Sequence, residues 1–431
     1  MASDQRVAII GLGYVGLPLA LAFAEAGLDV EGIDSSARRV EELAAGTSPI
    51  DDVSDERLAA ALAGHLAIHD TAAGRPGDAD AVFVCVPTPI TATKDPDLGP
   101  VEAAGAYLAG QLRKGQLIVL QSTTFPGTTN GPFREALEAG GLHAGTDFDL
   151  AFAPERVNPG DPASASRGVP RLVGGTTAAA TERAAALLRK INDHVLPLSS
   201  PDVAELAKLL ENVFRNVNIA LVNQLALLCE RMGLDVWEVI DAAATKPFGF
   251  MRFTPGPGVG GHCIPVDPYY LSWRAREFDF VDRFVELAGD INLGMPRHVV
   301  DLVAEALNDR RRALHGAKVG VIGVAFKPNV QDPRNSPAAA VIAGLAERGG
   351  EVRFHDPHIS SFKDDAGVIR TGEPLDTILS WADVVVVLTR HAAVDWSAVY
   401  GRSQLVVDTV NSSAGAQARE RQVLRLGAGW S

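Results

Sequence analysis

The stretch Val7-Ala-Ile-Ile-Gly-Leu-Gly-Tyr-Val-Gly-Leu-Pro-Leu-Ala-Leu-Ala-Phe-Ala24 decides the fold of the first part of the chain. Its first four residues are a short apolar run that predicts a buried β-strand, and residues 17–24 predict a helix. Between them, three glycines form a GxGxxG turn. A lone GxGxxG is weak evidence, but the pattern of strand, glycine turn and helix is typical of a dinucleotide-binding unit.

The next apolar segment, residues 28–34, predicts a second strand that ends in Asp34, about 20 residues after the turn. A carboxylate there can bind ribose hydroxyls and repels a 2′-phosphate, which favours NAD over NADP. The pyrophosphate would lie at the helix N-terminus. Arg38 and Arg39 follow this strand, where an arginine can serve NADP, and a glycine turn that only packs a helix remains the alternative. The predicted cofactor contacts here are Gly11, Gly13, Tyr14, Val15, Gly16, Asp34 and Arg39.

The same part of the chain continues with alternating strands and helices. Residues 81–86 and 116–121 predict buried parallel strands, which end in Pro87-Thr88-Pro89 and Ser122-Thr123-Thr124. Ligands of open α/β sheets bind beyond the carboxyl ends of the strands, so these turns should line the cofactor cleft. We therefore add to the cofactor contacts Val86, Pro87, Thr88, Ser122 and Thr123.

A further predicted strand, residues 148–153, leads into Glu155 and Arg156. Glu155 is a candidate acid–base group because it directly follows a strand end, and an exposed loop acid is an equally good interpretation from the residues alone.

The segment that starts at Pro201 predicts a long helix, with Pro201 just before it and Gly233 just after it. A helix of about 30 residues spans roughly 45 Å and can link domains and supply a dimer surface. Lys208 and Asn212 lie four residues apart on one face, where they could stabilise a developing oxyanion. A solvated polar stripe fits the spacing equally well. Cys229 lies in an apolar run and should be a core residue.

The segment 255–267, Pro-Gly-Pro-Gly-Val-Gly-Gly-His-Cys-Ile-Pro-Val-Asp, sets Cys263 in a loop with four glycines. Glycines allow a ligand to approach the main chain closely, and a nucleophilic thiol needs such access. Asp267, four residues later, could orient or activate a water. A buried structural cysteine is the alternative, because buried sites are common for a lone cysteine.

A further unit follows the charged segment 310–316. A strand from residue 318, a helix at 336–347 and strands at 351–355, 383–388 and 405–408 predict a second, smaller doubly wound sheet. Lys327 follows its first strand and would suit a phosphate, with Asp332 and Arg334 in the next loop. The predicted fold is α/β, with two Rossmann-like doubly wound domains joined by a long central helix. The predicted domains are 1–198, 199–312 and 313–431.

Composition narrows the class of protein. The chain has 431 residues, a net charge of −14 and 47% hydrophobic residues, which fit a multidomain globular enzyme and argue against nucleic-acid or anionic-membrane partners. No apolar run approaches the roughly 20 residues of a membrane helix. Three cysteines fit a reducing compartment, so we expect a cytoplasmic protein without a signal peptide. No metal is expected.

Together these motifs resemble the UDP-glucose/GDP-mannose dehydrogenases, also called nucleotide-sugar 6-dehydrogenases, over nearly the whole chain. Segments 245–258 and 264–276 look most like the bacterial UDP-N-acetylglucosamine 6-dehydrogenase branch. The matching pieces are Gly11–Ala20, Cys85–Pro89, Ser122–Thr129, Pro154–Gly160, Ala204–Asn212, Gly256–Asp267 and Gly323–Pro337. One departure is the run Asp408-Thr409-Val410, because the family often has an arginine after Asp-Thr that binds substrate.

The resemblance implies oxidation of a hexose C6 alcohol to a carboxylate, with two NAD and one water. UDP-GlcNAc or UDP-glucose is favoured as the substrate, with UDP-ManNAc or TDP-glucose as alternatives. Cys263 would hold the aldehyde as a thiohemiacetal and then the acid as a thioester. Lys208 and Asn212 would stabilise oxyanions, and Asp267 would help to activate water.

The resemblance also gives Glu155 a role in proton transfer or water positioning and places Arg334 against NAD. The substrate-binding set that it implies is Glu155, Arg156, Lys208, Asn212, Arg252, Phe253, Gly258, Gly260 and Lys327. A homodimer or higher homo-oligomer is expected. Two other classes are a two-electron hydroxyacid-type dehydrogenase, which needs no thiol, and a non-catalytic nucleotide-sugar sensor. The number of NADH formed per sugar separates the three.

Overall fold

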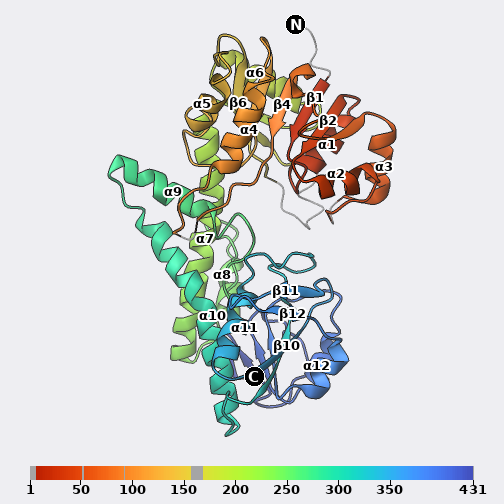
Figure 1. Ribbon diagram of the computed structural model, residues 1–431. Coiled ribbons are helices and arrows are strands. Elements are labelled where there is room, and N and C mark those ends of the chain that lie inside the picture. Colours follow the sequence, from red (N-terminus) through yellow and green to blue (C-terminus); the bar gives the residue numbers. More distant parts are fainter. Residues whose placement is uncertain (1–5, 51–52, 92, 157–167, 431) are drawn as a thin grey trace. The chain divides into compact units, whose positions relative to one another are not determined.

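The computed structural model describes residues 6–50, 53–91, 93–156 and 168–430 (Figure 1). The chain divides into two compact units. The N-terminal unit consists of residues 1–211 and 269–281, and the C-terminal unit consists of residues 212–268 and 282–431. The three predicted domain ranges remain a prediction.

The N-terminal unit is built on an eight-stranded sheet with the order β3-β2-β1-β4-β5-β6-β7-β8. Every neighbouring pair is parallel except β6 and β7. The strands are β1 Arg6–Ile10, β2 Asp29–Asp34, β3 Leu66–Asp70, β4 Ala81–Val84, β5 Leu117–Leu120, β6 Asp149–Phe152, β7 Arg171–Gly175 and β8 Val195–Leu198. The helices are α1 Gly16–Glu25, α2 Ala37–Ala44, α3 Asp55–Ala63, α4 Gly99–Ala109, α5 Pro132–Glu138, α6 Ala178–Leu188 and the short 3₁₀ helix Pro76–Asp78.

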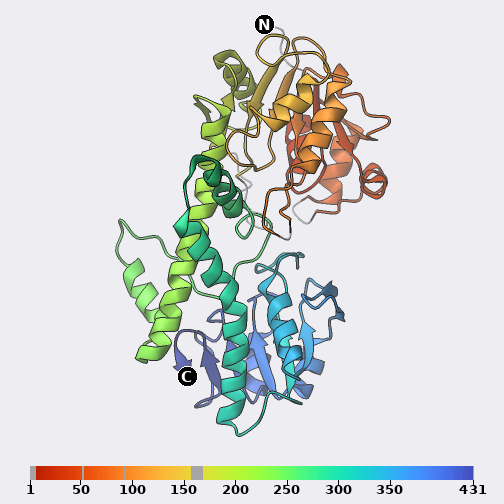
Figure 2. The ribbon, with the colours of Figure 1, turned by 60° about the vertical axis from the view of Figure 1, so that its left-hand side comes forward.

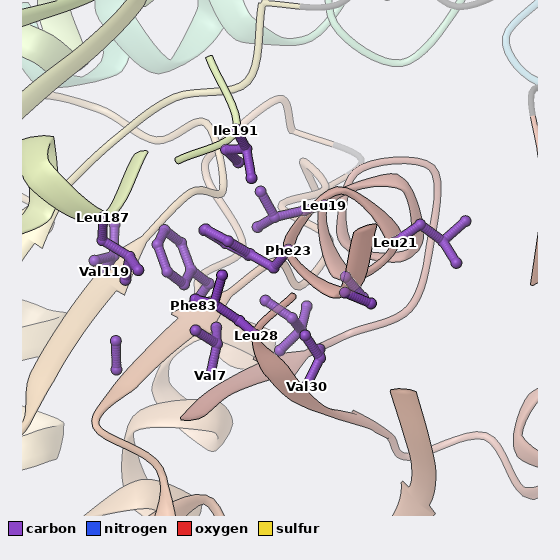
Figure 3. Packing of buried hydrophobic residues seen from close by; sticks show 14 of the residues in the cluster. Val7, Leu19, Leu21, Phe23, Leu28, Val30, Phe83, Val119, Leu187 and Ile191 are labelled. Atoms are coloured by element: carbon purple, nitrogen blue, oxygen red, sulfur yellow. The ribbon is translucent and has the colours of Figure 1, made fainter. Parts of the chain in front are cut away.

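The central strands of this sheet are buried on both faces, which is why β1, β4 and β5 read as apolar runs. Val7 and Ile9 of β1 belong to one hydrophobic cluster, whereas Ala8 and Ile10 belong to another on the opposite face. On the first face, the ring of Phe23 from α1 packs on that of Phe83 from β4, with centroids 5.2 Å apart (Figure 3). Helices therefore cover both faces, as the doubly wound prediction requires.

Two long helices contribute to the C-terminal unit. The 32-residue α7, Pro201–Met232, includes the proline that was predicted to precede it and ends directly before Gly233, as predicted. Asn212 is its first residue in this unit. The 27-residue α10, Arg283–Asp309, was not predicted and contains Pro296 in its interior. Within the C-terminal unit α7 lies beside α10 (Figure 2). Asn292 of α10 donates a hydrogen bond to Asn216 of α7 and accepts one from Asn223 of α7. The shorter helices that follow α7 are α8 Val236–Ala244 and α9 Asp267–Ala275, with a 3₁₀ turn at Arg276–Phe278.

The C-terminal unit contains a six-stranded sheet with the order β10-β9-β13-β14-β15-β16, antiparallel only between β15 and β16. Its strands are β9 Lys318–Ile322, β10 Glu351–His355, β13 Val384–Val387, β14 Val406–Asp408, β15 Val423–Arg425 and β16 Gly429–Trp430. Its remaining elements are α11 Pro337–Glu347, α12 Leu375–Trp381, α13 Trp396–Arg402 and the hairpin β11 Ser361–Lys363 with β12 Ile369–Thr371. The predicted fold class is confirmed, while the hairpin and the last two strands were not predicted.

None of the helices in the described part of the chain combines the length and the hydrophobicity of a membrane-spanning segment. Among the same residues, no group of three or more His, Cys, Asp or Glu side chains is placed to hold a metal ion.

Candidate functional site

The glycine turn after β1 is shaped by close backbone contacts. Gly11 has φ +88°, and a Cβ there would lie 2.6 Å from the carbonyl oxygen of Cys85. A Cβ at Gly16 would lie 1.8 Å from the carbonyl oxygen of Gly11. Gly13 differs, because the nearest atom to its Cβ position is a guanidinium nitrogen of Arg39 at 3.6 Å. The first and third glycines thus pack the fold, whereas the second leaves room for a ligand to approach the backbone.

Asp34, the last residue of β2, lies beside this turn. Its carboxylate accepts hydrogen bonds from the N–H groups of Leu12 and Ser36, both at 2.8 Å. Arg39 donates to the carbonyl oxygen of Leu12 at 3.1 Å. Val15 precedes α1 and its side chain does not cap the helix, so the amides of the first turn face the glycine turn. The open Gly13, the uncapped helix and the half-buried carboxylate fit the pyrophosphate and ribose of a dinucleotide.

The turns after β4 and β5 are tied to each other. Ser122 donates from Oγ to the carbonyl oxygen of Val86 at 2.7 Å, and Cys85 Sγ donates to Gln121 Oε1 at 3.2 Å. Burial and the neighbouring Glu155 carboxylate raise the pKa of the Cys85 thiol, so this cysteine stays protonated. The predicted cofactor contacts Val86, Pro87, Thr88, Ser122 and Thr123 thus lie on joined strand-end turns.

Glu155 is not a solvent-exposed loop acid. Its side chain is 15% exposed, and its carboxylate lies 3.0 Å from the guanidinium of Arg171. It also accepts a 2.8 Å hydrogen bond from the N–H of Arg156, whose own side chain pairs with Glu211 at 2.7 Å. The loop-acid alternative is therefore wrong. Residues 157–160 of the quoted motif lie outside the described residues.

The polar residues of α7 face inward. Lys208 is 9% exposed and Asn212 is 7% exposed, so the alternative of a solvated stripe is wrong. One turn earlier on the same stripe lies Glu205, which is fully buried. Its carboxylate accepts hydrogen bonds from the N–H of Gly127 at 2.7 Å and from the N–H and hydroxyl of Thr129 at 2.9 and 2.6 Å. Burial raises the pKa of Glu205 to about 7 against these bonds.

In the C-terminal unit, Asn212 is bonded to a second predicted site residue. Its Nδ2 donates to Asp267 Oδ2 at 2.5 Å, and Asp267 is 3% exposed. Asp267 is also the first residue of α9, and its N–H donates to the carbonyl oxygen of Cys263 at 2.8 Å. The structure thus brings Asn212, Asp267 and the backbone of Cys263 together.

The loop that carries Cys263 packs on the segment that follows β9. Cys263 is exposed. A Cβ at Gly260 or Gly261 would lie 2.8 or 2.9 Å from the side chain of Phe326, so larger residues would push the loop away. Asn335 donates from Nδ2 to the carbonyl oxygen of Gly261 at 3.1 Å. The glycines therefore let the loop lie close against the segment that follows β9.

His262, next to the cysteine, contacts the same segment. Its Nε2 lies 3.3 Å from Asp332 Oδ2, and Arg334 binds that carboxylate with two nitrogens at 2.9 Å. Partial burial and the Arg334 charge lower the pKa of His262, against the effect of Asp332. Burial opposes ionisation of Asp332, but the hydrogen bonds from Arg334 lower its pKa overall. Arg334, which was predicted to contact NAD, is thus held by Asp332, and Lys327 lies in the same segment after β9.

The other predicted substrate residues lie near α7 and α8. Arg252 binds Asp241 at 2.7 Å, and the ring of Phe253 packs edge-on against Phe214 with centroids 5.8 Å apart. Val410 stands where the family often has an arginine after Asp-Thr. Its N–H donates a hydrogen bond to Asp408 Oδ1 at 3.1 Å.

Sequence reasoning missed several buried polar residues. They are Glu205, Asn216, Asn223 and Asn292. His262, whose side chain is 43% exposed, was missed as well. The signal for three of them was available, because Glu205, Asn216 and Asn223 continue the helical stripe of Lys208 and Asn212 at spacings of three, four and seven residues.

Comparison with known proteins gives a consistent result. Residues 5–192, 202–293 and 320–414 match the NAD-binding, central and UDP-binding domains of the UDP-glucose/GDP-mannose dehydrogenase family. A UDP-N-acetyl-D-mannosamine dehydrogenase of Pyrococcus horikoshii is 36% identical over 94% of this chain and 96% of its own. A UDP-N-acetyl-D-glucosamine 6-dehydrogenase of Pseudomonas aeruginosa is 37% identical over 86% of this chain and 87% of its own.

Among solved structures, a UDP-D-ManNAc dehydrogenase from Pyrococcus horikoshii superimposes with a TM-score of 0.87 at 33% identity, covering 98% of this chain and 99% of that one. The similarity does not single out the UDP-N-acetylglucosamine branch that the sequence motifs predicted, because both enzyme names occur at nearly equal identity. The NAD cofactor and the dehydrogenase activity are confirmed. The chain belongs to the UDP-glucose/GDP-mannose dehydrogenase family and is an NAD-dependent nucleotide-sugar dehydrogenase.

Proposed function

We propose that the protein oxidises the C6 alcohol of UDP-N-acetyl-D-mannosamine to the uronic acid in two two-electron steps. The observation that carries this proposal is the near full-length similarity to dehydrogenases of that name, at up to 36% identity over 94% of the chain. UDP-N-acetylglucosamine is the second candidate, because one relative of that name is 37% identical. NAD supplies the hydride acceptor in both steps.

Cys263 is the proposed nucleophile. Its exposure and its place in a glycine-rich loop support this role, because a covalent intermediate needs an accessible thiol. After the first oxidation, the sulfur adds to the C6 aldehyde and gives a thiohemiacetal. Loss of a second hydride gives the thioester, and one water then releases the carboxylate and restores the thiol. One sugar thus consumes two NAD and one water.

Lys208 and Asn212 are the proposed oxyanion stabilisers. Their burial supports the proposal, because a donor in a dry site stabilises a developing charge more strongly than one in water. Since Asn212 donates to Asp267, we propose that this bond holds the carboxylate for activating the hydrolytic water. Glu155 is proposed to move protons or position water, with the guanidinium of Arg171 holding it in place. Lys327 is proposed to bind the sugar nucleotide and Arg334 the NAD.

A panel of sugars tests the substrate. NADH formation is measured with UDP-ManNAc, UDP-GlcNAc, UDP-glucose and TDP-glucose, and UDP-ManNAc should have the highest kcat/KM and give two NADH per sugar. A single NADH per sugar would contradict the four-electron reaction. Cys263→Ser should still bind NAD but release no uronic acid, whereas Cys229→Ser, at a buried core position, should leave the stoichiometry at two.

Lys208→Ala tests the oxyanion role. Removal of one oxyanion donor typically lowers turnover by about 10²–10³. We expect a loss of this size in kcat with little change in the apparent sugar affinity, because the interaction strengthens mainly in the transition state. Asn212→Ala should act in the same direction but more weakly, since no charge is lost. A kcat near that of the wild type for Lys208→Ala would remove the residue from the mechanism.

A homodimer is the proposed assembly. Large apolar side chains of α7 are exposed opposite its buried polar stripe: Val203, Leu206, Leu210, Phe214, Leu221, Leu228 and Met232. An apolar stripe of this length is typical of an interface. We expect Leu221→Glu with Leu228→Glu to give a monomer in sedimentation. Arg231→Gln, at an exposed polar position of the same helix, is the control and should leave the dimer intact. The cytoplasmic location stays a prediction.

A further inference from the structure

Three buried asparagines lie between α7 and α10 in the C-terminal unit. Asn223 is fully buried, and Asn216 and Asn292 are each 5% exposed. Asn216 and Asn223 are seven residues apart on α7 and therefore face the same side, toward Asn292 of α10. None of the three was assigned to the site by the family motifs quoted above. Buried amides are costly unless they are hydrogen-bonded, so their partners explain what they do.

The three side chains form a directed chain of hydrogen bonds. Asn292 Nδ2 donates to Asn216 Oδ1 at 2.8 Å and to the Asn216 backbone carbonyl at 3.2 Å. Asn223 Nδ2 donates to Asn292 Oδ1 at 2.9 Å. Each side-chain amide thus accepts a hydrogen bond at its oxygen, and Asn223 and Asn292 also donate one from their nitrogen to the next asparagine. This arrangement fixes the orientation of each side chain, because turning one amide over would set donor against donor.

The chain ends on the loop that carries Cys263. The N–H of Gly256 donates to Asn223 Oδ1 at 2.9 Å. Two residues later the loop passes over α10, where a Cβ at Gly258 would lie 3.3 Å from the Asn292 backbone oxygen. The other end of the loop is held by α7 as well, through the bond between Asn212 and Asp267. Asn212 and Asn223 are eleven residues, or roughly 16 Å, apart along the helix.

We propose that Asn223 and Asn292 are positioning residues that fix the start of the Cys263 loop on the α7–α10 pair. The proposal rests on the proposed role of Cys263 as the nucleophile. Asn223 holds the Gly256 amide, and Asn292 holds Asn223 in the orientation that this bond needs. Asn212 performs the matching task at the loop end, so one rigid helix sets both ends of the loop. Covalent catalysis needs the sulfur within a few tenths of an ångström of its productive position, and a loop with four glycines cannot supply this by itself.

Asn223→Ala and Asn216→Ala form the matched test. Both remove one buried amide from the same helix face, so both should lower the thermal unfolding midpoint. Only Asn223→Ala removes the acceptor of the Gly256 amide. In Asn216→Ala, Asn292 keeps the backbone carbonyl at residue 216 as an acceptor, and the contact with the loop stays intact. We compare the amide hydrogen exchange of peptides that cover residues 254–266 in the wild type and both variants, under conditions in which all three proteins have the same free energy of unfolding.

We expect exchange in the loop to be at least tenfold faster in Asn223→Ala and within twofold of wild type in Asn216→Ala. With UDP-ManNAc as the substrate, kcat should fall at least tenfold in Asn223→Ala while the KM for NAD stays within twofold. Asn223→Ser is the second variant in case the alanine variant is poorly folded, because its hydroxyl is one bond too short to reach Gly256 and should give the same loop exchange. Equal loop exchange in the position-223 and position-216 variants would overturn the proposal. If the wild type forms no NADH, the proposed function fails, and the exchange comparison still decides the positioning role.

Discussion

The turns that follow β1 and β9, the first strands of the two sheets, share one backbone design. Gly11 has φ +88° and donates its N–H to the carbonyl oxygen of Ile33, while Gly323 has φ +83° and donates to that of His355. In both sheets an aspartate at the end of the second strand accepts hydrogen bonds from N–H groups of this turn. Asp34, the last residue of β2, accepts from Leu12, and Asp356, directly after β10, accepts from Val324 and Ala325.

The two aspartates differ in what else they bind. Asp34 is half-buried and accepts one further amide bond, from Ser36. Asp356 is 8% exposed, accepts the amides of His358 and Ile359, and lies 3.0 Å from Nε2 of the fully buried His391. Burial opposes ionisation of Asp356, but the His391 bond and the amides outweigh it and lower its pKa to about 2.

This difference shows that an acid at the end of the second strand does not by itself make a ribose site. In the C-terminal sheet the protein itself satisfies the carboxylate, so Asp356 holds the turn in shape. In the N-terminal sheet the carboxylate stays partly accessible beside the open Gly13, so it can both shape the turn and meet a ligand. At equivalent places in the two sheets, Asp356 therefore has a structural role alone, whereas Asp34 can also bind a ligand.

Asp356→Ala should give the largest effect and break the structural half of the comparison. It removes a buried carboxylate and leaves four amides and His391 without their partner, so we expect a loss of about 3–5 kcal/mol in the free energy of unfolding. Asp34→Ala, the matched variant in the other sheet, should cost only about 1 kcal/mol because water can reach the released amides. Urea unfolding of both variants measures this, and equal losses would remove the distinction between the two acids.

Glu205 sharpens the comparison because burial raises its pKa to about 7, whereas the pKa of Asp356 is lowered. Between its ordinary value of 4.5 and 7, the folded protein binds more protons at this site than the unfolded chain. Its contribution to stability is therefore fully present below pH 4.5 and lost as the pH rises through 7, by roughly 3 kcal/mol.

Urea unfolding from pH 4.5 to 8 measures this dependence. Glu205→Gln should remove the downward trend, while Glu211→Gln, at a position with a 35% exposed side chain, should keep it. Parallel stability curves for wild type and Glu205→Gln would show that the carboxyl titrates at its ordinary value.

The central strands of both sheets and α7 could be predicted because their signals are local, whereas β3, β7, β8, β11, β12, β15 and β16 were missed. The buried strands β4, β5 and β13 are continuous apolar runs, and α7 is bounded by Pro201 and Gly233. The helix α10 was missed because Pro296 interrupts its pattern, although the surrounding structure tolerates a proline there.

The burial direction of α7 could not be predicted, because periodicity shows two stripes without showing which one faces the core. In this helix the polar stripe with Lys208 and Asn212 is buried, whereas Leu210 and Leu221 are 61% and 60% exposed. The polar stripe is buried because its side chains bind partners that are far away in the sequence. These partners are Asp267, Asn292 and the amides of Gly127 and Thr129, and no local sequence pattern reveals them.

Gly323→Ala and Gly13→Ala test the two turns from the backbone side. Gly323 has a positive φ, and a Cβ there would lie 2.4 Å from the carbonyl oxygen of Thr389. We expect a loss of about 2 kcal/mol in the free energy of unfolding. Gly13→Ala should change this free energy by less than about 0.5 kcal/mol, because its Cβ position is open, and should weaken NAD binding instead. Thermal unfolding with and without NAD distinguishes them, and a smaller NAD-induced shift is expected only for Gly13→Ala.

Asp34→Ala tests the ligand-binding half of the comparison through a modest change in cofactor affinity. The carboxylate should bind the ribose hydroxyls of NAD and repel the 2′-phosphate of NADP. We expect NAD to bind about tenfold more weakly, or roughly 1.4 kcal/mol, and the preference for NAD over NADP to narrow. Asp34→Asn is the control for the turn, because its amide oxygen can still accept the Leu12 N–H while the charge is lost. If Asp34→Ala binds NAD less well while Asp34→Asn binds it like the wild type, with an unchanged NAD/NADP ratio in both, Asp34 acts through the shape of the turn, as Asp356 does. A narrowed ratio in both variants assigns the cofactor preference to the charge itself.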